Sequence, residues 1–314
     1  MNHVTAKSMV FAMLIHGGRV AIRDIFSVSQ FWTDVKRHRC TTTVLMGATI
    51  NFLFKQPPHP DEINNTFRFV LAAPATPDIE EFKKRFGLEV CTVFNMTEIC
   101  SPISSEGFIT QDFNYKSCGR PRAGFTCRIV DELDQEVPVG TVGELVVRSD
   151  EPWRLNAGYW RNPEKTAEAW RNLWFHTGDA FYRDDAGYYY FVDRIKDYIR
   201  RRGENICSSD VEVEINSHPK VLESAAIGVP SEYGEQEVKA AVVLNPGEEL
   251  DPATLIEYLK PRMPYYAIPR YIEYVNELPK TPTEKVKKAL LREQGITVNT
   301  WDREKVGIKV DRNS

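Results

Sequence analysis

The sequence lacks the short motifs that mark the most common nucleotide-binding and hydrolytic sites. It contains no GxxxxGKS or GxxxxGKT phosphate loop, no GxGxxG turn, no HExxH pair and no GxSxG nucleophile turn. Its 6 cysteines include no CxxC pair and have no histidine at metal-ligand spacing. Any chemistry of the chain must therefore rest on a less generic arrangement of residues.

The composition shows neither an excess of basic residues nor a long apolar run. With 40 basic and 44 acidic residues the formal net charge is −4, which predicts no nucleic-acid partner. No apolar stretch reaches the length of about 20 residues that a membrane span requires. The N-terminus lacks a basic region followed by an apolar core and a cleavage site, so we predict a cytoplasmic protein with reduced cysteines.

The first third of the chain alternates strand-like and helix-like segments. Three apolar runs are predicted to be buried strands: residues 42–46, 67–73 and 88–94. Between the second and the third, Thr76 as N-cap, Pro77 at the first helical position and Gly87 at the stop predict a helix. This alternation with short connections predicts an α/β sheet over residues 1–118.

From about residue 119 the pattern changes to short strands joined by polar turns. The candidate strands are residues 125–130, 143–148 and 188–192. The turn sequences between them, such as DDAG at residues 184–187, are typical of an antiparallel sheet. Residues 119–192 are therefore predicted to form an antiparallel β subdomain, which completes a large N-terminal domain of residues 1–195.

A smaller α+β domain is predicted over residues 196–295, followed by a tail of residues 296–314. Ser209 and Glu212 have the spacing of a capping box, and the helix that they open must end before Pro219. The strands predicted for this domain are residues 225–229, 238–244 and 271–275. A domain of this size is within the range that folds independently.

Four sequence blocks rich in polar and aromatic residues follow one another along the chain. They are FNMTE at residues 94–98, GYWRNPEKT at 158–166, WFHTGD at 174–179 and DRIKDYI at 193–199. Behind them come GENI at residues 203–206 and a loop that ends at Lys285. In this order the blocks resemble those of the AMP-forming acyl-CoA synthetases of the adenylate-forming superfamily. Residues 279–301 are most similar to its carnitine/crotonobetaine-CoA ligase branch.

The resemblance implies a reaction in two steps that uses ATP, Mg²⁺ and coenzyme A. A carboxylic acid substrate first attacks the α-phosphate of ATP to give acyl-AMP and pyrophosphate, and CoA then takes the acyl group. Because two anions must approach each other, such a site needs cations and oriented donors. The resemblance also implies that the small C-terminal α+β domain is a mobile lid on the large domain.

The resemblance places phosphate and adenine contacts at the ends of strands. It implies that Thr97 contacts a phosphate and that Glu98 binds Mg²⁺, both as catalytic residues, at an edge where α/β sheets commonly bind ligands. A loop threonine followed by a solvated glutamate is the alternative. The resemblance also implies that Asn95 lies beside the nucleotide, at a position where the family usually has glycine. The segment that resembles the adenine-binding loop consists of Ala72, Ala73 and Pro74.

The later blocks are implied to hold the ribose and to move the lid. Asp179 would accept hydrogen bonds from the ribose hydroxyls and Arg194 would reach the same sugar, with a structural salt bridge between the two as the alternative. Lys196 resembles the family's hinge, which absorbs the backbone rotation of the lid. Gly203 and Glu204 resemble the segment that enters the active site for the CoA step.

Lys285 resembles the lysine that contacts both the substrate carboxylate and the α-phosphate during adenylation. A flexible point cation suits charge that develops only in the transition state. An ordinary exposed lysine at a helix start is the alternative. The basic run at residues 200–202 is interpreted as a solvated face near the 3′-phosphate of CoA.

The resemblance also predicts that the chain is an N-terminally truncated member of the family. The family's Ser/Thr/Gly-rich phosphate loop is absent, and residues 1–4 resemble the end of the block that follows it, which makes His3 a residue of the acyl pocket. We therefore expect these 314 residues alone to be inactive or weakly active. A remnant that binds AMP or CoA weakly and an adenylation domain of a peptide synthetase stay open as alternative functions. A homodimer stays open as an alternative to a monomer.

Overall fold

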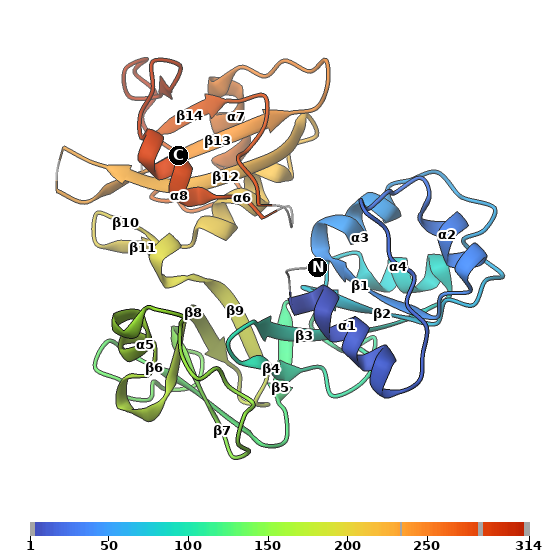
Figure 1. Ribbon diagram of the computed structural model, residues 1–314. Coiled ribbons are helices and arrows are strands. Elements are labelled where there is room, and N and C mark those ends of the chain that lie inside the picture. The colour runs from blue at the N-terminus through green and yellow to red at the C-terminus, as the bar shows by residue number, and fades with distance from the viewer. Residues whose placement is uncertain (1–3, 233, 282–284, 311–314) are drawn as a thin grey trace. The chain divides into compact units, whose positions relative to one another are not determined.

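The computed structural model describes residues 4–232, 234–281 and 285–310 (Figure 1). The chain divides into two compact units, Met1–Phe191 and Val192–Ser314. The predicted hinge residue Lys196 lies in the second unit, beyond this boundary. Among the described residues, no helix combines the length and the apolar character that crossing a membrane requires.

The first unit opens with the predicted α/β arrangement (Figure 1). Its helices are α1 (Val4–Ile15), α2 (Phe31–His38), α3 (Gly47–Phe54) and α4 (Ile79–Phe86). Its strands are β1 (Thr42–Met46), β2 (Phe69–Ala73) and β3 (Glu89–Met96). β2 pairs in parallel with both β1 and β3, which confirms the predicted α/β sheet. Trp32 of α2, Phe82 of α4 and Val90 of β3 belong to one apolar core.

Helix α4 begins later than its sequence predicts. Its N-cap position is Asp78 instead of Thr76, and no side chain caps it. The amide of Ile79 donates to the carbonyl of Thr76 at 3.1 Å, so Pro77 lies in a turn before the helix. The predicted end is confirmed, because Gly87 adopts φ +64° and its amide donates to the carbonyl of Lys83 at 2.9 Å.

The antiparallel part of the first unit continues the same sheet. Its strands are β4 (Cys100–Ser104), β5 (Ser117–Pro121), β6 (Phe125–Val130), β7 (Gly143–Ser149), β8 (Phe175–Arg183) and β9 (Tyr189–Arg194). The last three residues of β9 belong to the second unit. One helix, α5 (Pro163–Ala169), and a 3₁₀ turn, η1 (Arg171–Leu173), precede β8. Hydrogen bonds link all nine strands in the order β1-β2-β3-β4-β5-β9-β8-β7-β6. The predicted antiparallel strands are therefore confirmed, as an extension of the parallel ones.

Strands β3 and β8 carry two of the sequence blocks and share one core. Phe94 of β3 meets Phe181 of β8 edge to face, with ring centroids 4.9 Å apart. Ile99, which follows β3, and Phe175 of β8 belong to the same buried cluster. This packing fixes the two strands relative to each other although they are not neighbours in the sheet.

The second unit is the predicted α+β module. Its strands are β10 (Ile199–Arg201), β11 (Glu204–Ile206), β12 (Val221–Pro230), β13 (Gln236–Leu244), β14 (Tyr271–Tyr274) and β15 (Trp301–Asp302). Its helices are α6 (Ser208–Asn216), α7 (Pro252–Leu259) and α8 (Lys288–Gln294). In β12, Ala226 packs with residues of α6 and α7, whereas Ala225 and Ile227 pack with Leu291 of α8. Helices thus cover both faces of the sheet, which explains why its strands are apolar at successive positions.

Helix α6 is capped from outside the predicted capping box. Asp193 accepts hydrogen bonds at Oδ2 from the amide of Ser208 at 2.8 Å and from its hydroxyl at 2.5 Å. Ser209 donates instead to a carbonyl of β9, and Glu212 accepts from an amide of β12. The capping-box prediction is therefore wrong, because these two side chains tie the helix to neighbouring strands. The predicted end before Pro219 is confirmed.

Part of the predicted tail belongs to the fold of the second unit. β15 pairs with β14 in antiparallel fashion as the edge strand of the sheet. Arg270 donates to both carboxylate oxygens of Asp302, each at 3.2 Å. Arg303 is 2% exposed and donates to the carbonyl of Pro269 at 3.1 Å. These contacts anchor the segment after α8.

Candidate active site

The turn after β3 presents the first pair of predicted site residues. Thr97 is exposed, and Glu98 is half-buried with its backbone carbonyl accepting from the amide of Asn156 at 2.7 Å. The hydroxyl of Tyr159 donates to Glu98 Oε1 at 3.2 Å. Cys100 follows as an exposed free thiol with φ +55°. The turn is thus anchored by Ile99 and by Asn156, and Glu98 is oriented by a tyrosine of another block.

The predicted adenine-binding loop leaves the sheet at the same edge. Ala72 is fully buried in β2 and lies opposite Thr92 of β3, and β2 ends one residue later at Ala73. Pro74 follows through a cis peptide bond and is exposed. Because β2 and β3 are parallel, this loop and Thr97 both follow carboxyl ends of strands, where α/β sheets bind ligands.

Asn95 of β3 keeps one polar atom buried. Its Oδ1 is shielded from solvent and accepts no hydrogen bond within the described part of the chain. An amide oxygen in this position is an acceptor without a partner, which is costly unless a ligand donor satisfies it. The observation is compatible with the predicted place of Asn95 beside a nucleotide, and the role stays a prediction.

Asp179 lies on a bulge in β8. In the pairing with β7, Ala180 lies opposite Glu144 and His176 opposite Val146, so residues 177–179 face the single residue Leu145. Such a bulge kinks a strand and redirects its side chains, and bulges are over-represented next to active sites. Asp179 itself is 3% exposed.

The sequence Thr-Gly-Asp supplies what this bulge requires. Gly178 adopts φ +69°, a backbone conformation that costs other residues about 1–2 kcal/mol. The hydroxyl of Thr177 donates to the carbonyl of Leu145 at 2.7 Å and accepts from the amide of Asp179 at 3.1 Å. One side chain therefore satisfies two backbone groups that the interrupted ladder leaves without strand partners.

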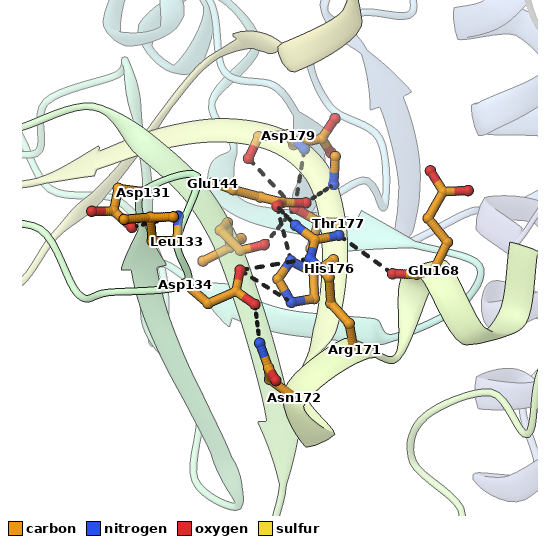
Figure 2. Close-up of polar contacts among 12 residues, drawn as sticks. Asp131, Leu133, Asp134, Glu144, Glu168, Arg171, Asn172, His176, Thr177 and Asp179 are labelled. Carbon is orange, nitrogen blue, oxygen red and sulfur yellow. Dashed lines mark hydrogen bonds and ion pairs between the residues drawn. The ribbon is translucent and has the colours of Figure 1, made fainter.

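The side chain of Glu144 lies beside His176 and Thr177 (Figure 2), and it accepts from another amide of the bulge. Its Oε1 accepts from the amide of Gly178 at 2.9 Å. Its Oε2 accepts from Nδ1 of His176 and from the guanidinium of Arg171, both at 2.8 Å. The other ring nitrogen of His176 lies 3.8 Å from the carboxylate of Asp134. A network of acidic and basic groups, in which His176 is buried and Arg171 is exposed, thus lies around the backbone that precedes Asp179.

This network sets the ionisation of Glu144. Burial alone would raise its pKa, but hydrogen bonds from His176 and Gly178, and the charges of His176 and Arg171, hold the pKa below the ordinary 4.5. A carboxyl with a lowered folded-state pKa contributes stability above its unfolded-state pKa, and this contribution is lost as the pH falls through the folded-state value. At neutral pH Glu144 is therefore an ionised acceptor.

We predict that the stabilising effect of Glu144 disappears in acid. The difference in free energy of unfolding between the wild type and Glu144→Gln should be full at neutral pH and shrink as the pH falls below about 4.5. Urea unfolding of both proteins across this range measures the difference. A difference that stays constant between neutral and acidic pH contradicts the prediction.

In the second unit, Arg194 and Lys196 lie on either side of a strand end. Arg194 is the last residue of β9 and is half-buried, whereas Lys196 is exposed in the 3₁₀ turn η2 (Ile195–Asp197). Asp197 of this turn forms an ion pair with Arg292 of α8. Since Asp179 belongs to the other unit, the ribose site shared with Arg194 stays a prediction.

Gly203 and Glu204 lie at the tip of the β10–β11 hairpin. Arg202 and Gly203 have φ +53° and +83°, the left-handed pair that a tight two-residue hairpin requires. The amide of Gly203 donates to Glu235 at 3.0 Å, and Glu204 is exposed. The basic run before this tip is only partly the solvated face that the sequence predicts, because Arg201 is 2% exposed.

Lys285 closes a short backbone ring at the end of its loop. Its carbonyl accepts from the amide of Thr281 at 2.8 Å, and its amide donates to the hydroxyl of Thr281 at 3.2 Å. Lys280 and Val286 form a bridge just outside this ring. Lys285 is exposed. The acyl-pocket residue His3 lies outside the described residues, so the structure places the lysine but not the histidine.

Sequence reasoning missed the residues that support the predicted ones. Glu144 was visible as an acidic residue at the start of a strand that is otherwise apolar, and His176 and Tyr159 were visible within the blocks. No local pattern pairs Glu144 with His176, because they approach each other only across the β7–β8 ladder. Buried polar groups need partners, so a charged residue inside an apolar run was the available signal.

Comparison with known proteins identifies the family. The model of the AMP-binding enzyme family matches residues 1–160, and the model of the AMP-binding enzyme C-terminal domain matches residues 210–285. The chain belongs to the AMP-binding enzyme family, and the resemblance to adenylate-forming CoA ligases is confirmed.

Curated relatives include CoA ligases. The chain is 34% identical to sulfoacetate–CoA ligase of Cupriavidus necator, over 89% of this chain and 55% of the relative. It is 31% identical to crotonobetaine/carnitine–CoA ligase of Citrobacter koseri, over 88% of this chain and 54% of the relative. The chain therefore spans about half the length of the curated relatives that it matches.

Solved structures of adenylate-forming enzymes share the fold. ATP-bound MatB from Rhodopseudomonas palustris matches with a TM-score of 0.79 and 27% identity, over 91% of this chain and 56% of that one. O-succinylbenzoate coenzyme A synthetase from Bacillus subtilis, in complex with AMP, matches with a TM-score of 0.78 and 26% identity, over 93% and 58%.

Proposed function

We propose that this chain carries the ribose-binding, magnesium-binding and catalytic-lysine residues of an ATP-dependent carboxylate–CoA ligase. The observation that carries the proposal is the bulge of β8, where Thr177 and Glu144 hold the backbone around Asp179. A carboxylate held in one orientation can accept hydrogen bonds from two neighbouring hydroxyls, which a ribose ring offers. Because the chain spans about half of its relatives, the activity of the whole protein is part of the proposal.

Glu98 is the residue that we assign to Mg²⁺. Among the described residues, no group of three or more His, Cys, Asp or Glu side chains could hold a metal by themselves. Mg²⁺ is usually held by one or two carboxylates together with substrate phosphates, and the half-buried Glu98 fits that pattern. When bound there, the ion neutralises charge on the phosphates. Thr97, exposed beside it, would contact a phosphate.

Lys285 and the β10–β11 hairpin are assigned to the two successive steps. With Lys285 at the substrate, its ammonium group offsets the charge that develops as the carboxylate attacks the α-phosphate. Rotation at Lys196 then withdraws this lysine and brings in Gly203 and Glu204, so that CoA can attack the acyl-AMP. Gly203 has a positive φ, which fits the tight turn of the hairpin. It has no side chain, and no atom lies within 4 Å of where a Cβ would stand, so the space beside the backbone is open.

The acid that we propose as substrate is small and carries a second charged group. The support comes from the curated relatives, whose names specify sulfoacetate and crotonobetaine or carnitine. These acids combine a carboxylate with a sulfonate or a quaternary ammonium group. The predicted acyl-pocket residue His3 lies outside the described residues, so the structure does not test this choice of substrate. A comparison of substrates tests it instead.

ATP–pyrophosphate exchange tests the proposed function directly. Exchange is measured with sulfoacetate, crotonobetaine, carnitine and o-succinylbenzoate in the 314-residue chain. If the natural polypeptide is longer, the same measurement is made on it. AMP binding is measured in parallel by calorimetry. Exchange that requires one of these acids, followed by CoA-dependent product release, supports a CoA ligase.

The other outcomes of this experiment separate the remaining alternatives. AMP binding without exchange in either protein indicates a nucleotide-binding remnant. Exchange with product release that does not depend on CoA indicates the chemistry of a peptide-synthetase adenylation domain. Absence of both AMP binding and exchange contradicts the proposal.

A further inference from the structure

We propose that Glu144 and His176 form a positioning pair that holds the bulge of β8, and thereby sets the nucleotide discrimination of Asp179. The inference rests on the proposed function, in which Asp179 binds the ribose. It assigns to two residues outside the predicted nucleotide site a measurable part in ribose recognition. Neither residue is proposed to touch the nucleotide.

The contacts of Glu144 are directed at the bulge. One carboxylate oxygen accepts from the amide of Gly178, the residue before Asp179, and the other accepts from His176, three residues before it. The side chain of Glu144 is 11% exposed, and that of His176 is 3% exposed. An ion pair that served only to join β7 and β8 would need no bond to the amide of Gly178. That bond places the carboxylate next to the one bulge residue with a left-handed backbone.

The donors and acceptors of Glu144 and His176 explain why both side chains are needed to hold the bulge. At neutral pH a carboxylate can only accept, so Nδ1 of His176 is the donor of their shared bond. The Nε2 side of the ring faces Asp134, whose other carboxylate oxygen accepts from Asn172. Nε2 and Asp134 are 3.8 Å apart and share no hydrogen bond, so the ring is held through the Nδ1 bond to Glu144 (Figure 2). The ring in turn restrains the rotamer of Glu144 that reaches the amide of Gly178.

Loss of this support should act on Asp179 through the backbone. Gly178 is an exposed residue, so without its acceptor the amide would pair with water or another group, and the bulge would lose this contact to β7. Small displacements of a positioned group, of about 1 Å, have large effects on recognition and rate. Thr177 holds the bulge from its other side, so we expect a loosened bulge that is still folded.

The experiment compares two nucleotides that differ only in the hydroxyls that Asp179 would bind. Calorimetry measures the affinities of AMP and of 2′,3′-dideoxy-AMP for the wild type, Asp179→Asn, Glu144→Gln, His176→Leu and His176→Asn. We expect Glu144→Gln and His176→Leu to lower the preference for AMP by about tenfold, as loss of a bond to a charged group does, without weakening dideoxy-AMP binding. His176→Asn retains a donor near Nδ1 and should keep most of the preference.

A matched control is an acidic residue that forms an ion pair with the far end of the same strand, β8. Glu136 forms an ion pair at 3.1 Å with Arg183, the last residue of β8, and makes no bond to the bulge. Glu136→Gln should leave the ratio of the two affinities unchanged. Thermal unfolding of every variant shows whether a variant is folded, and the His176→Leu and His176→Asn pair keeps the test informative if Glu144→Gln unfolds.

The outcomes distinguish this inference from the proposed function. If the wild type and Asp179→Asn show the same preference between the nucleotides, the ribose assignment fails and the positioning pair fails with it. If the wild type prefers AMP and Asp179→Asn does not, the ribose assignment holds. Glu144→Gln or His176→Leu proteins that then keep the wild-type preference overturn the positioning role alone.

Discussion

Replacing Lys285 with alanine is expected to abolish adenylation and to leave the second half-reaction intact. Removal of an ammonium group that acts on the transition state should lower the rate of ATP–pyrophosphate exchange roughly 10²–10³-fold. Formation of acyl-CoA from preformed acyl-AMP should be unchanged, because in the proposed mechanism the lysine is withdrawn during that step. Both rates are measured in the natural polypeptide, with the acid that supports exchange in the wild type.

Lys287 provides the matched control for this loop. It is exposed, as Lys285 is, and its backbone amide donates to the carbonyl of Pro279 at 2.7 Å. An alanine variant keeps the backbone amide that makes this bond. Lys287→Ala should therefore keep both half-reactions. An equal loss of both half-reactions in Lys285→Ala contradicts the alternation of the lid between two positions, because it indicates that one arrangement serves both steps.

Replacing Glu237 with alanine should cost the second unit most of its stability. Glu237 is 1% exposed, and its Oε2 forms an ion pair with Nε of Arg201 at 2.6 Å. Removing one partner of a buried pair leaves a charge without compensation, which typically costs about 3–5 kcal/mol. Arg303 lies near Arg201. Its pKa is lowered first by burial and second by the positive charge of Arg201. Without Glu237 the two guanidinium groups would repel each other in a buried environment.

Hydrogen exchange with mass spectrometry localises this effect to the second unit. Peptides from β12 and β13 should lose protection in Glu237→Ala, while those from β2 and β3 keep it. The control is Glu248→Ala, because Glu248 and Lys220 pair at 3.0 Å with both side chains more than 40% exposed. Such an exposed pair contributes at most about 1 kcal/mol. A loss no larger than that of the control would show that the buried pair is dispensable.

The order of the elements could be predicted because it depends on local patterns. Apolar runs predicted the buried strands. A glycine after a helical pattern predicted the end of α4 at Gly87. The starts of α4 and α6 could not be predicted in this way. Asp193, which caps α6, is distant in sequence from Ser208, and a distant residue can replace a local capping box without leaving a sequence signal.

The candidate site likewise contains residues that local sequence patterns predict and residues that depend on distant partners. Motif similarity pointed to Asp179, Thr97 and Lys285, because these residues stand in recognisable blocks. The bulge that holds Asp179 arises from a register shift against β7, and register belongs to a pair of strands rather than to one sequence. Glu144 lies outside every block, and its partners could be assigned only when the β7–β8 ladder was known. Supporting residues of this kind are found from structure because their partners are non-local.

The exposed thiol of Cys100 offers a position for site-specific labelling. Burial raises the pKa of Cys118 and Cys127 to about 12 and that of Cys207 to about 11. Thiol reagents act on the thiolate, so the raised pKa values of these three cysteines slow their alkylation at neutral pH. Among the six cysteines, all within the described residues, only Cys100 is exposed. A maleimide fluorophore would therefore attach beside the turn of Glu98, where its emission could report on nucleotides without any engineered cysteine.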